Sequence, residues 1–255
     1  MPGVGKYIYC IIESSNERNF GPIGIGGRGD NVTTVGYRDL SVVVSNSTME
    51  KYVISRENMM AHEKVVEGVM RDYTVLPVRF CTIATSAEDL RNLLRRRYPE
   101  FKNLLRDMDG KVELSLKVLW ADMKAIYSEI VAENPGIARL RNKVNRMPGS
   151  RSYQGKISLG EKVKDALDKK RDREARTMLK ALKGACVDCR ENNTFGDSMI
   201  MNAAFLVDRF HEKEFDSLVH DLENDMGERV VLSYVGPAPP YNFVNISVEW
   251  TQEAV

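Results

Sequence analysis

Histidine, cysteine and tryptophan are scarce in this sequence, and long apolar runs are absent. The 255 residues include three His, four Cys and two Trp. The apolar stretches are short, such as residues 41–44, and fall far below the roughly 20 residues that span a bilayer. With so few histidines, and no pair of acids singled out by pattern, the usual groups for acid–base catalysis and metal binding are poorly represented. We therefore expect no reaction centre, no cofactor, no metal site and no contact with a lipid membrane.

Net charge is also nearly absent. Lys and Arg total 37 against 36 Asp and Glu, which gives a formal net charge of +1 and no long-range field to attract nucleic acid. The hydrophobic fraction of 43% and the charged fraction of 29% are typical of a folded globular chain. Cys10 and Cys81 lie inside apolar, strand-like runs, so we interpret them as reduced core thiols of a protein in the cytoplasm.

The first part of the sequence predicts an α+β domain over residues 1–109. Apolar or alternating runs predict strands, and serines followed by apolar positions three and four residues apart predict capped helices. Pro77 cannot donate a ladder hydrogen bond, so its strand is expected at a sheet edge or at a bulge. The expected strands cover residues 6–13, 32–35, 40–45 and 75–83, and the expected helices follow Ser55 and Ser86.

The remainder predicts a second α+β domain over residues 110–255, with a helical insertion at about 122–190. Residues 111–120 alternate apolar and polar side chains, which is the period of a half-buried strand. Further strands are expected at 198–207, 229–235 and 241–248, and helices at 122–133, 136–146, 158–183 and 211–225, of which 158–183 is long and charged. The predicted fold class is α+β with two domains, each a mixed or antiparallel sheet with packed helices and ferredoxin-like (split βαβ) elements.

Two short motifs resemble known chemical sites. Residues 24–29 satisfy G-x-G-x-x-G, but a turn and strand follow, whereas dinucleotide binding requires a helix there. Cys186 and Cys189 form a C-x-x-C pair without a second pair of ligands and without the strand that precedes a thioredoxin-type pair. We interpret the first motif as a flexible connection. An enzyme that uses either motif remains an alternative hypothesis.

Two basic stretches, 139–146 and 169–176, give a second alternative. Acids are interleaved in the later stretch, which favours a solvated helix with internal ion pairs, whereas the earlier stretch is more purely basic. The alternative is an RNA- or ligand-binding regulatory protein with ferredoxin-like domains that makes contact through residues 139–146. The net charge of +1 argues against it.

Several segments, in this order along nearly the whole chain, resemble the gas vesicle protein F/L family (GvpF/GvpL). One departure is Ala238, where the family more often carries tryptophan, and another is Cys81, where the family commonly carries glycine. The resemblance is carried by the segments YIY at 7–9, GIGG at 24–27, DLSVVVS at 39–45, HEKVVE at 62–67, VLPVRF at 75–80, GKVE at 110–113, KV at 117–118, NAAFLV at 202–207 and GPAPPYNFV at 236–244.

The resemblance implies a minor structural or assembly component of gas vesicles, the gas-filled protein shells that give prokaryotic cells buoyancy. The implied partners are the small apolar shell protein, GvpA, and other gas vesicle proteins, and the implied location is the gas vesicle in the cytoplasm. A subunit as apolar as the shell protein aggregates before assembly unless another protein covers it. We predict Phe80, Tyr241 and Phe243, the aromatic residues near the prolines, as protein interface residues.

Overall fold

The computed structural model describes residues 4–50, 52–147 and 149–248, with the side chains of 149–151 excepted. The chain divides into two compact units, Met1–Glu113 together with Pro237–Val255, and Leu114–Gly236. The sequence analysis instead assigns everything after residue 109 to one second domain. The difference has a local cause in the first unit, because both carboxylate oxygens of Glu113 accept hydrogen bonds from Asn242.

The first unit is built on a sheet in which the strand order is β2-β3-β4-β1-β5, and β6 also pairs with β1. Its centre is β1, a ten-residue strand that is apolar on both faces and pairs antiparallel with β4, β5 and β6. A β-bulge interrupts the β1–β4 register between Ile8 and Cys10. The strands are β1 (Val4–Glu13), β2 (Asn19–Gly21), β3 (Val32–Tyr37), β4 (Leu40–Thr48), β5 (Val75–Pro77) and β6 (Ile83–Ala84).

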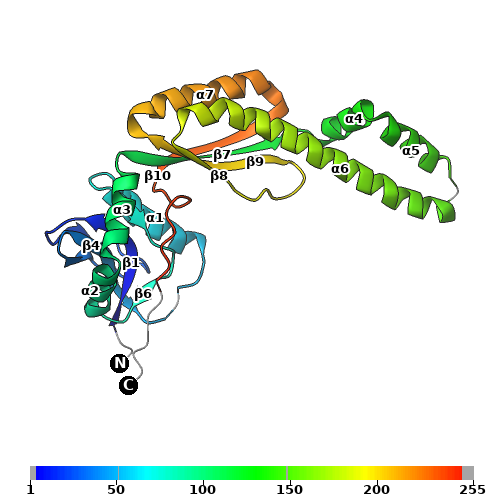
Figure 1. Ribbon diagram of the computed structural model, residues 1–255. Coiled ribbons are helices and arrows are strands. Elements are labelled where there is room, and N and C mark those ends of the chain that lie inside the picture. Colours follow the sequence, from blue (N-terminus) through cyan, green and yellow to red (C-terminus); the bar gives the residue numbers. More distant parts are fainter. Residues whose placement is uncertain (1–3, 51, 148, 249–255) are drawn as a thin grey trace. The chain divides into compact units, whose positions relative to one another are not determined.

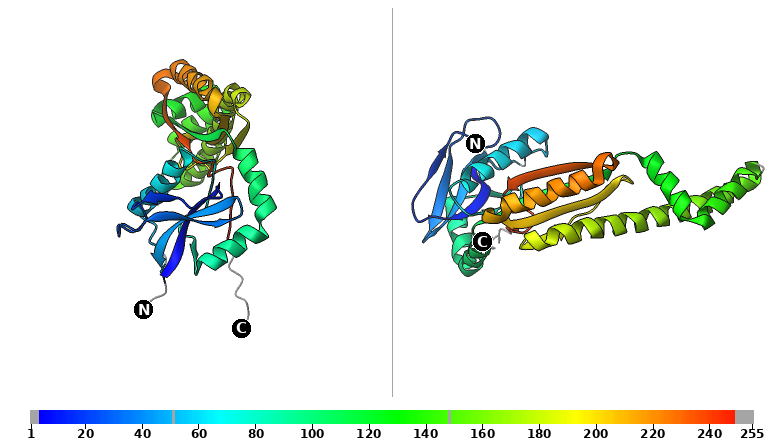
Figure 2. Two further views of the ribbon diagram at one scale, coloured as in Figure 1. Left: turned by 90° about the vertical axis from the view of Figure 1, so that its left-hand side faces the viewer. Right: turned by 90° about the horizontal axis from the view of Figure 1, so that it is seen from above.

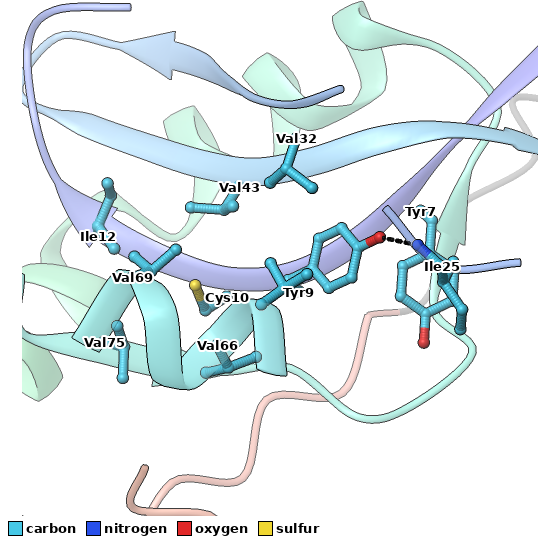
Figure 3. Close-up of a cluster of buried hydrophobic side chains, with 11 residues drawn as sticks. Tyr7, Tyr9, Cys10, Ile12, Ile25, Val32, Val43, Val66, Val69 and Val75 are labelled. Carbon is cyan, nitrogen blue, oxygen red and sulfur yellow. Dashed lines mark hydrogen bonds between the residues drawn. The ribbon is translucent and has the colours of Figure 1, made fainter. Parts of the chain in front are cut away.

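Three helices pack on this sheet. Helix α1 (Arg56–Met70) begins at Ser55, whose side chain accepts a hydrogen bond from the Asn58 N–H. Figure 3 shows how Val66 and Val69 of α1 face Cys10 and other buried side chains of β1. Helix α2 (Ala87–Arg96) has an equivalent cap at Ser86, and α3 (Tyr98–Met108) follows it with a proline in its first turn.

The strand expected over residues 75–83 is two short strands. Between β5 and β6 the chain turns at Cys81, whose φ of 65° lies in the left-handed region. Within this segment Pro77 is the last residue of β5, and it pairs with Cys10 of β1. The prediction of one continuous strand over residues 75–83 was therefore wrong. The apolar composition of this run gives no sign of the turn at Cys81.

The second unit is a four-stranded sheet of order β10-β7-β9-β8 with helices packed against it. In Figures 1 and 2 the C-terminal part of α6 and helix α7 lie side by side along the sheet, and both contact β9. The elements are β7 (Lys111–Trp120), α4 (Met123–Glu133), α5 (Pro135–Asn145), α6 (Gly149–Leu182), β8 (Asp188–Glu191), β9 (Met199–Asp208), α7 (Glu212–Met226) and β10 (Val230–Ala238).

One helix boundary and one strand in this unit differ from expectation. The long charged helix was expected to begin at residue 158, but α6 already begins at Gly149. Strand β8 was not expected, because its side chains Asp188, Arg190 and Glu191 are charged or exposed and carry no apolar alternation. It forms as an edge strand that pairs antiparallel with β9.

The prediction of a last strand over residues 241–248 is wrong. The Phe243 and Val244 N–H groups both donate to the Pro240 carbonyl, which makes a tight turn where the strand was expected. One isolated bridge joins Ile246 to Val78. Apolar composition favoured a strand, but here it reflects burial of Val244 and Ile246 in the core of the first unit.

Candidate protein-binding surface

Aromatic rings gather around one buried histidine in the first unit. His62, on α1, is 3% exposed, and its ring centroid lies 5.7 Å from that of Tyr7, 5.9 Å from that of Phe80 and 6.4 Å from that of Tyr241. We call this group, with Tyr9 and Tyr52, the His62 cluster. Aromatic pairs at such separations add to the stability gained by burial alone. The cluster is therefore a rigid base for the surface beside it.

His62 is held as a neutral imidazole. Its Nδ1 lies 3.0 Å from the Tyr7 hydroxyl, which also accepts a hydrogen bond from the Cys81 N–H at 3.0 Å. Burial lowers the pKa of His62 to about 4, and the nearby Val78 carbonyl acts in the opposite direction. That carbonyl does not meet Nε2 in hydrogen-bonding geometry, and Nε2 has no hydrogen-bonding partner among the described residues.

The glycine-rich loop closes over the same cluster. The Ile25 N–H donates to the Tyr9 hydroxyl at 2.8 Å, as Figure 3 shows, and this hydroxyl also bonds the Ser45 side chain. A Cβ on Gly24 would lie 2.7 Å from the Asp30 carbonyl oxygen, so only glycine fits there. The loop leads into strand β3 and packs on tyrosine, which gives its glycines a structural role.

Exposed apolar side chains lie together at the start of α1. Val53 is 75% exposed, Ile54 81% and Met60 55%, and Met59 is 40% exposed. We call these four residues the α1 apolar surface. The segment adjoins the turn at Cys81, because the Tyr52 N–H donates to the Cys81 sulfur at 3.2 Å. The three- and four-residue spacing of Met59 from His62, Val66 and Val69 predicts that Met59 faces the core, and no pattern identifies the other three as exposed, although apolar residues just before a helix cap are a usable signal.

The three predicted interface residues occupy the first unit but do not form one exposed patch. Phe80 is half-buried in the His62 cluster. Tyr241 is also half-buried; burial raises the pKa of its hydroxyl, which has no hydrogen-bonding partner among the described residues. Phe243 is half-buried in the turn after Pro240. Their role in an interface stays a prediction.

The second unit contains a charge cluster around the buried Lys170. The Lys170 ammonium lies 2.7 Å from Glu133 and 3.0 Å from Glu129, and Arg229 bonds both Glu129 and Glu174. The Arg229 guanidinium lowers the pKa of Glu129 to about 2. Burial lowers the pKa of Lys170, but Glu133 and Glu129 outweigh it, so the pKa is raised. Every charge here has a partner, and the cluster joins α4 and α6 to the sheet.

Cys186 and Cys189 follow α6, half-buried, with Cys189 on β8. Burial raises the pKa of Cys189 to about 11, with the neighbouring Cys186 thiol adding to the effect, so neither the thiolate nor a metal ligand is favoured. Across residues 4–50, 52–147 and 149–248, no group of three or more His, Cys, Asp or Glu could hold a metal ion. Nor does any helix of those residues have the length and apolar character needed to cross a membrane.

Exposed apolar side chains such as those of the α1 apolar surface are typical of surfaces at which proteins bind other proteins. Comparison with known proteins identifies the family. The family described as "Gas vesicle synthesis protein GvpL/GvpF" matches residues 5–245. Gas vesicle protein F of a Streptomyces species is 30% identical over 94% of this chain and 100% of its own length. Gas vesicle protein F1 of Halobacterium salinarum is 28% identical, covering 97% and 96% of the two chains.

Solved structures show the same fold. The crystal structure of gas vesicle protein GvpF from an Anabaena species superposes with a TM-score of 0.83 at 24% identity, over 96% of this chain and 100% of that one. The corresponding structure from Microcystis aeruginosa gives a TM-score of 0.79 at 24% identity, over 94% and 98%. The chain belongs to the gas vesicle GvpL/GvpF family. Its role is therefore associated with gas vesicles, and the family resemblance noted in the sequence is confirmed.

Proposed function

We propose that this protein is a minor structural or assembly component of gas vesicles that binds the small apolar shell protein, GvpA, in the prokaryotic cytoplasm and catalyses no reaction. Family membership supports a role among gas vesicle proteins. The observation that carries the proposal is the α1 apolar surface, because proteins rarely expose large apolar side chains in a contiguous segment without a partner. A strongly apolar subunit is the partner that such a surface suits.

The surface has a rigid support. Tyr52 packs edge-on against Tyr7 at 5.4 Å between ring centroids, and its N–H is fixed by the Cys81 sulfur, so the segment that carries Val53 and Ile54 is anchored at its start. Ser55 then caps α1 and anchors the other end. A preordered apolar segment loses little conformational entropy on binding. Phe80, half-buried beside this segment, and the more distant Tyr241 and Phe243 are the proposed ring contacts.

We also propose that the second unit is a ferredoxin-like unit with a helical insertion. In chain order its strands are β7, β8, β9 and β10, and the sheet order places the fourth, first, third and second of them side by side. Helices lie between the first and second strands and between the third and fourth. This order supports a split βαβ arrangement, and α4, α5 and the first part of α6 would be the insertion.

The function is tested by co-purification with tagged shell protein. The variant V53S/I54S/M60S removes most of the α1 apolar surface, and V187S/V231S/V235S removes three comparably exposed valines of the second unit. We expect the first variant to retain at most roughly a tenth of the shell protein, since buried apolar anchors dominate binding, and the second to retain the wild-type amount. A further variant, Phe243→Asp, tests the predicted ring contacts.

Equal retention by both triple variants would remove the α1 apolar surface from the interface. If the unaltered protein retains no more shell protein than unrelated cytoplasmic proteins, the proposed partner is wrong.

A further inference from the structure

The tip of the helical part of the second unit carries charge of one sign. Between Asn134 and Gly160 no Asp or Glu occurs, although the whole chain is almost neutral. The basic residues of this stretch are Arg139, Arg141, Lys143, Arg146, Arg151 and Lys156. Four of them lie on α5 or at its C-cap, and we call Arg139, Arg141, Lys143 and Arg146 the α5 basic surface.

The packing of α5 against α6 turns Arg139, Lys143 and Arg146 outward, and Arg141 is exposed at the edge of the face that carries the buried residues. Ile137 and Val144 are buried, and a Cβ on Gly155 of α6 would lie 2.8 Å from the Val144 side chain, so the two helices approach closely at that glycine. The four cations are all exposed. None has an ion pair or a side-chain hydrogen bond with any residue that the structure describes.

Some cations of α6 are paired with carboxylates of the same helix. On α6, Lys164 lies 3.1 Å from Asp168, and Arg171 lies at the same distance from that carboxylate. On α5, by contrast, Arg139 and Lys143 are like charges four residues apart, an arrangement that disfavours a helix. Asn134 gives α5 no side-chain cap bond. The helix dipole favours Lys143 and Arg146, which lie in the last turn and at the C-cap of α5, but Arg139 and Arg141 gain no such support from their own helix.

We infer that the α5 basic surface is a docking site for an acidic segment of a partner protein. Its charge is complementary to carboxylates spaced along a helix or an extended chain, and Arg favours such groups because it bonds them in pairs. Single-stranded RNA is disfavoured because base stacking needs several aromatic rings, whereas only Tyr153 is an exposed aromatic on the described part of this tip. A membrane surface is disfavoured because the apolar face of α5 is already buried against α6.

This surface is separate from the proposed shell-binding surface. The α1 apolar surface belongs to the first unit and the α5 basic surface to the second. A single chain could then hold an apolar subunit and an acidic protein at once. The inference goes beyond binding of the shell protein. A variant that loses binding of the acidic peptide and keeps binding of the shell protein, or the reverse, distinguishes the two proposals.

The test measures fluorescence anisotropy of three labelled probes at physiological ionic strength: a glutamate–alanine helical peptide, an oligouridine of equal charge and vesicles of phosphatidylserine and phosphatidylcholine. The tip variant is R139Q/R141Q/K143Q/R146Q. The matched control, K162Q/K169Q/R176Q/K180Q, removes the same charge from exposed positions of α6 that lie among acids. We expect the full-length protein to prefer the peptide, and the tip variant alone to bind it roughly tenfold or more weakly, because complementary charge raises association rates by that order.

Thermal unfolding checks the fold of both variants. The tip variant should melt at close to the temperature of the unaltered protein, because it loses the repulsion between Arg139 and Lys143 together with the favourable interaction of Lys143 and Arg146 with the helix dipole. Three results would overturn the inference: equal weakening in both variants, tighter binding of oligouridine or vesicles than of peptide, or a lower Tm for the tip variant, which would mean that the cations stabilise the helical tip itself.

Discussion

At the scale of single residues, His62 is a base that folding keeps uncharged. Its pKa of about 4 lies below the ordinary value of 6.5, so the unfolded chain binds a proton between these pH values and the folded chain does not. The contribution of His62 to stability is therefore fully present above about pH 6.5 and is lost as the pH falls toward 4. Burial raises the pKa of Glu63, so the effect of Glu63 on the pH dependence of stability has the opposite sign.

The pH dependence can be measured by replacing the imidazole. The free energy of unfolding of the unaltered protein should fall by about 3 kcal/mol relative to His62→Gln as the pH falls from 6.5 to 4, because each pKa unit is about 1.4 kcal/mol. Chemical denaturation at several pH values gives the difference directly. The exposed His220 provides the control, and a His220→Gln variant should run parallel to the unaltered protein. Parallel curves for His62→Gln as well would show that the buried imidazole is not the source.

Cys81 shows what a sequence can reveal at one residue. The resemblance noted in the sequence implies glycine at this position, and the structure places Cys81 at a φ of 65°, a conformation that glycine adopts without strain. Its sulfur accepts a hydrogen bond from the Tyr52 N–H, which glycine could not do. The sequence alone does not reveal this turn, because the backbone conformation and the hydrogen-bonding partner depend on the folded chain.

At the scale of elements, local patterns predicted most boundaries. The strand at Lys111–Trp120 is confirmed to the residue, and the serine caps of α1 and α2 are confirmed by their hydrogen bonds. Failures occurred where tertiary contacts decide. Strand β8 depends on pairing with β9, and the expected strand at 241–248 begins with a turn, its apolar residues Val244 and Ile246 being buried in the core.

The candidate site was less predictable than the elements. Phe80 was predicted only as an interface residue, and the structure places it among the rings around His62. The exposed residues Val53 and Ile54 were not recognised. Periodicity identifies residues that face a core, whereas an exposed apolar residue carries no period of its own. Exposure is a property of the folded surface, so it could not be obtained from spacing along the chain.

Leucine substitutions at two glycines of α6 should change the free energy of unfolding in opposite directions. Leucine at Gly155 must displace Val144 and should lower the free energy of unfolding by about 1–3 kcal/mol, the usual cost of overpacking. Leucine at Gly160, where nothing lies within contact distance of a Cβ, should raise it by somewhat under 1 kcal/mol through helix propensity. Urea denaturation of Gly155→Leu and Gly160→Leu gives both values. Changes of the same sign would contradict the close approach of α5 and α6.

At the scale of the whole molecule, the first unit is built from two stretches of sequence that lie on either side of the second unit. Val244 and Ile246 are 5% and 1% exposed, and Glu113 receives two hydrogen bonds from Asn242. Removing large buried side chains costs about 2–5 kcal/mol each, which is comparable with the stability of a domain.

A chain that ends at Gly236 should therefore lose the fold of its first unit and keep that of its second. Hydrogen exchange followed by mass spectrometry reports each unit separately, and β1 amides should lose protection while β7 and β9 amides keep it. A control chain that ends at Val248 retains the contacts of Val244 and Ile246. Undiminished protection of β1 in the shorter chain would mean that the C-terminal segment is dispensable.

Because residues 237–248 complete a unit that begins before residue 114, the ribosome must synthesise the entire second unit before the first has all its parts. Domains fold as units when their sequence has emerged, so the order of translation and the order of folding are reversed here. The α1 apolar surface would then become fixed only near the end of synthesis. A nascent chain stalled after Gly236 would expose its unfinished N-terminal sheet to chaperones while its C-terminal neighbour is already native.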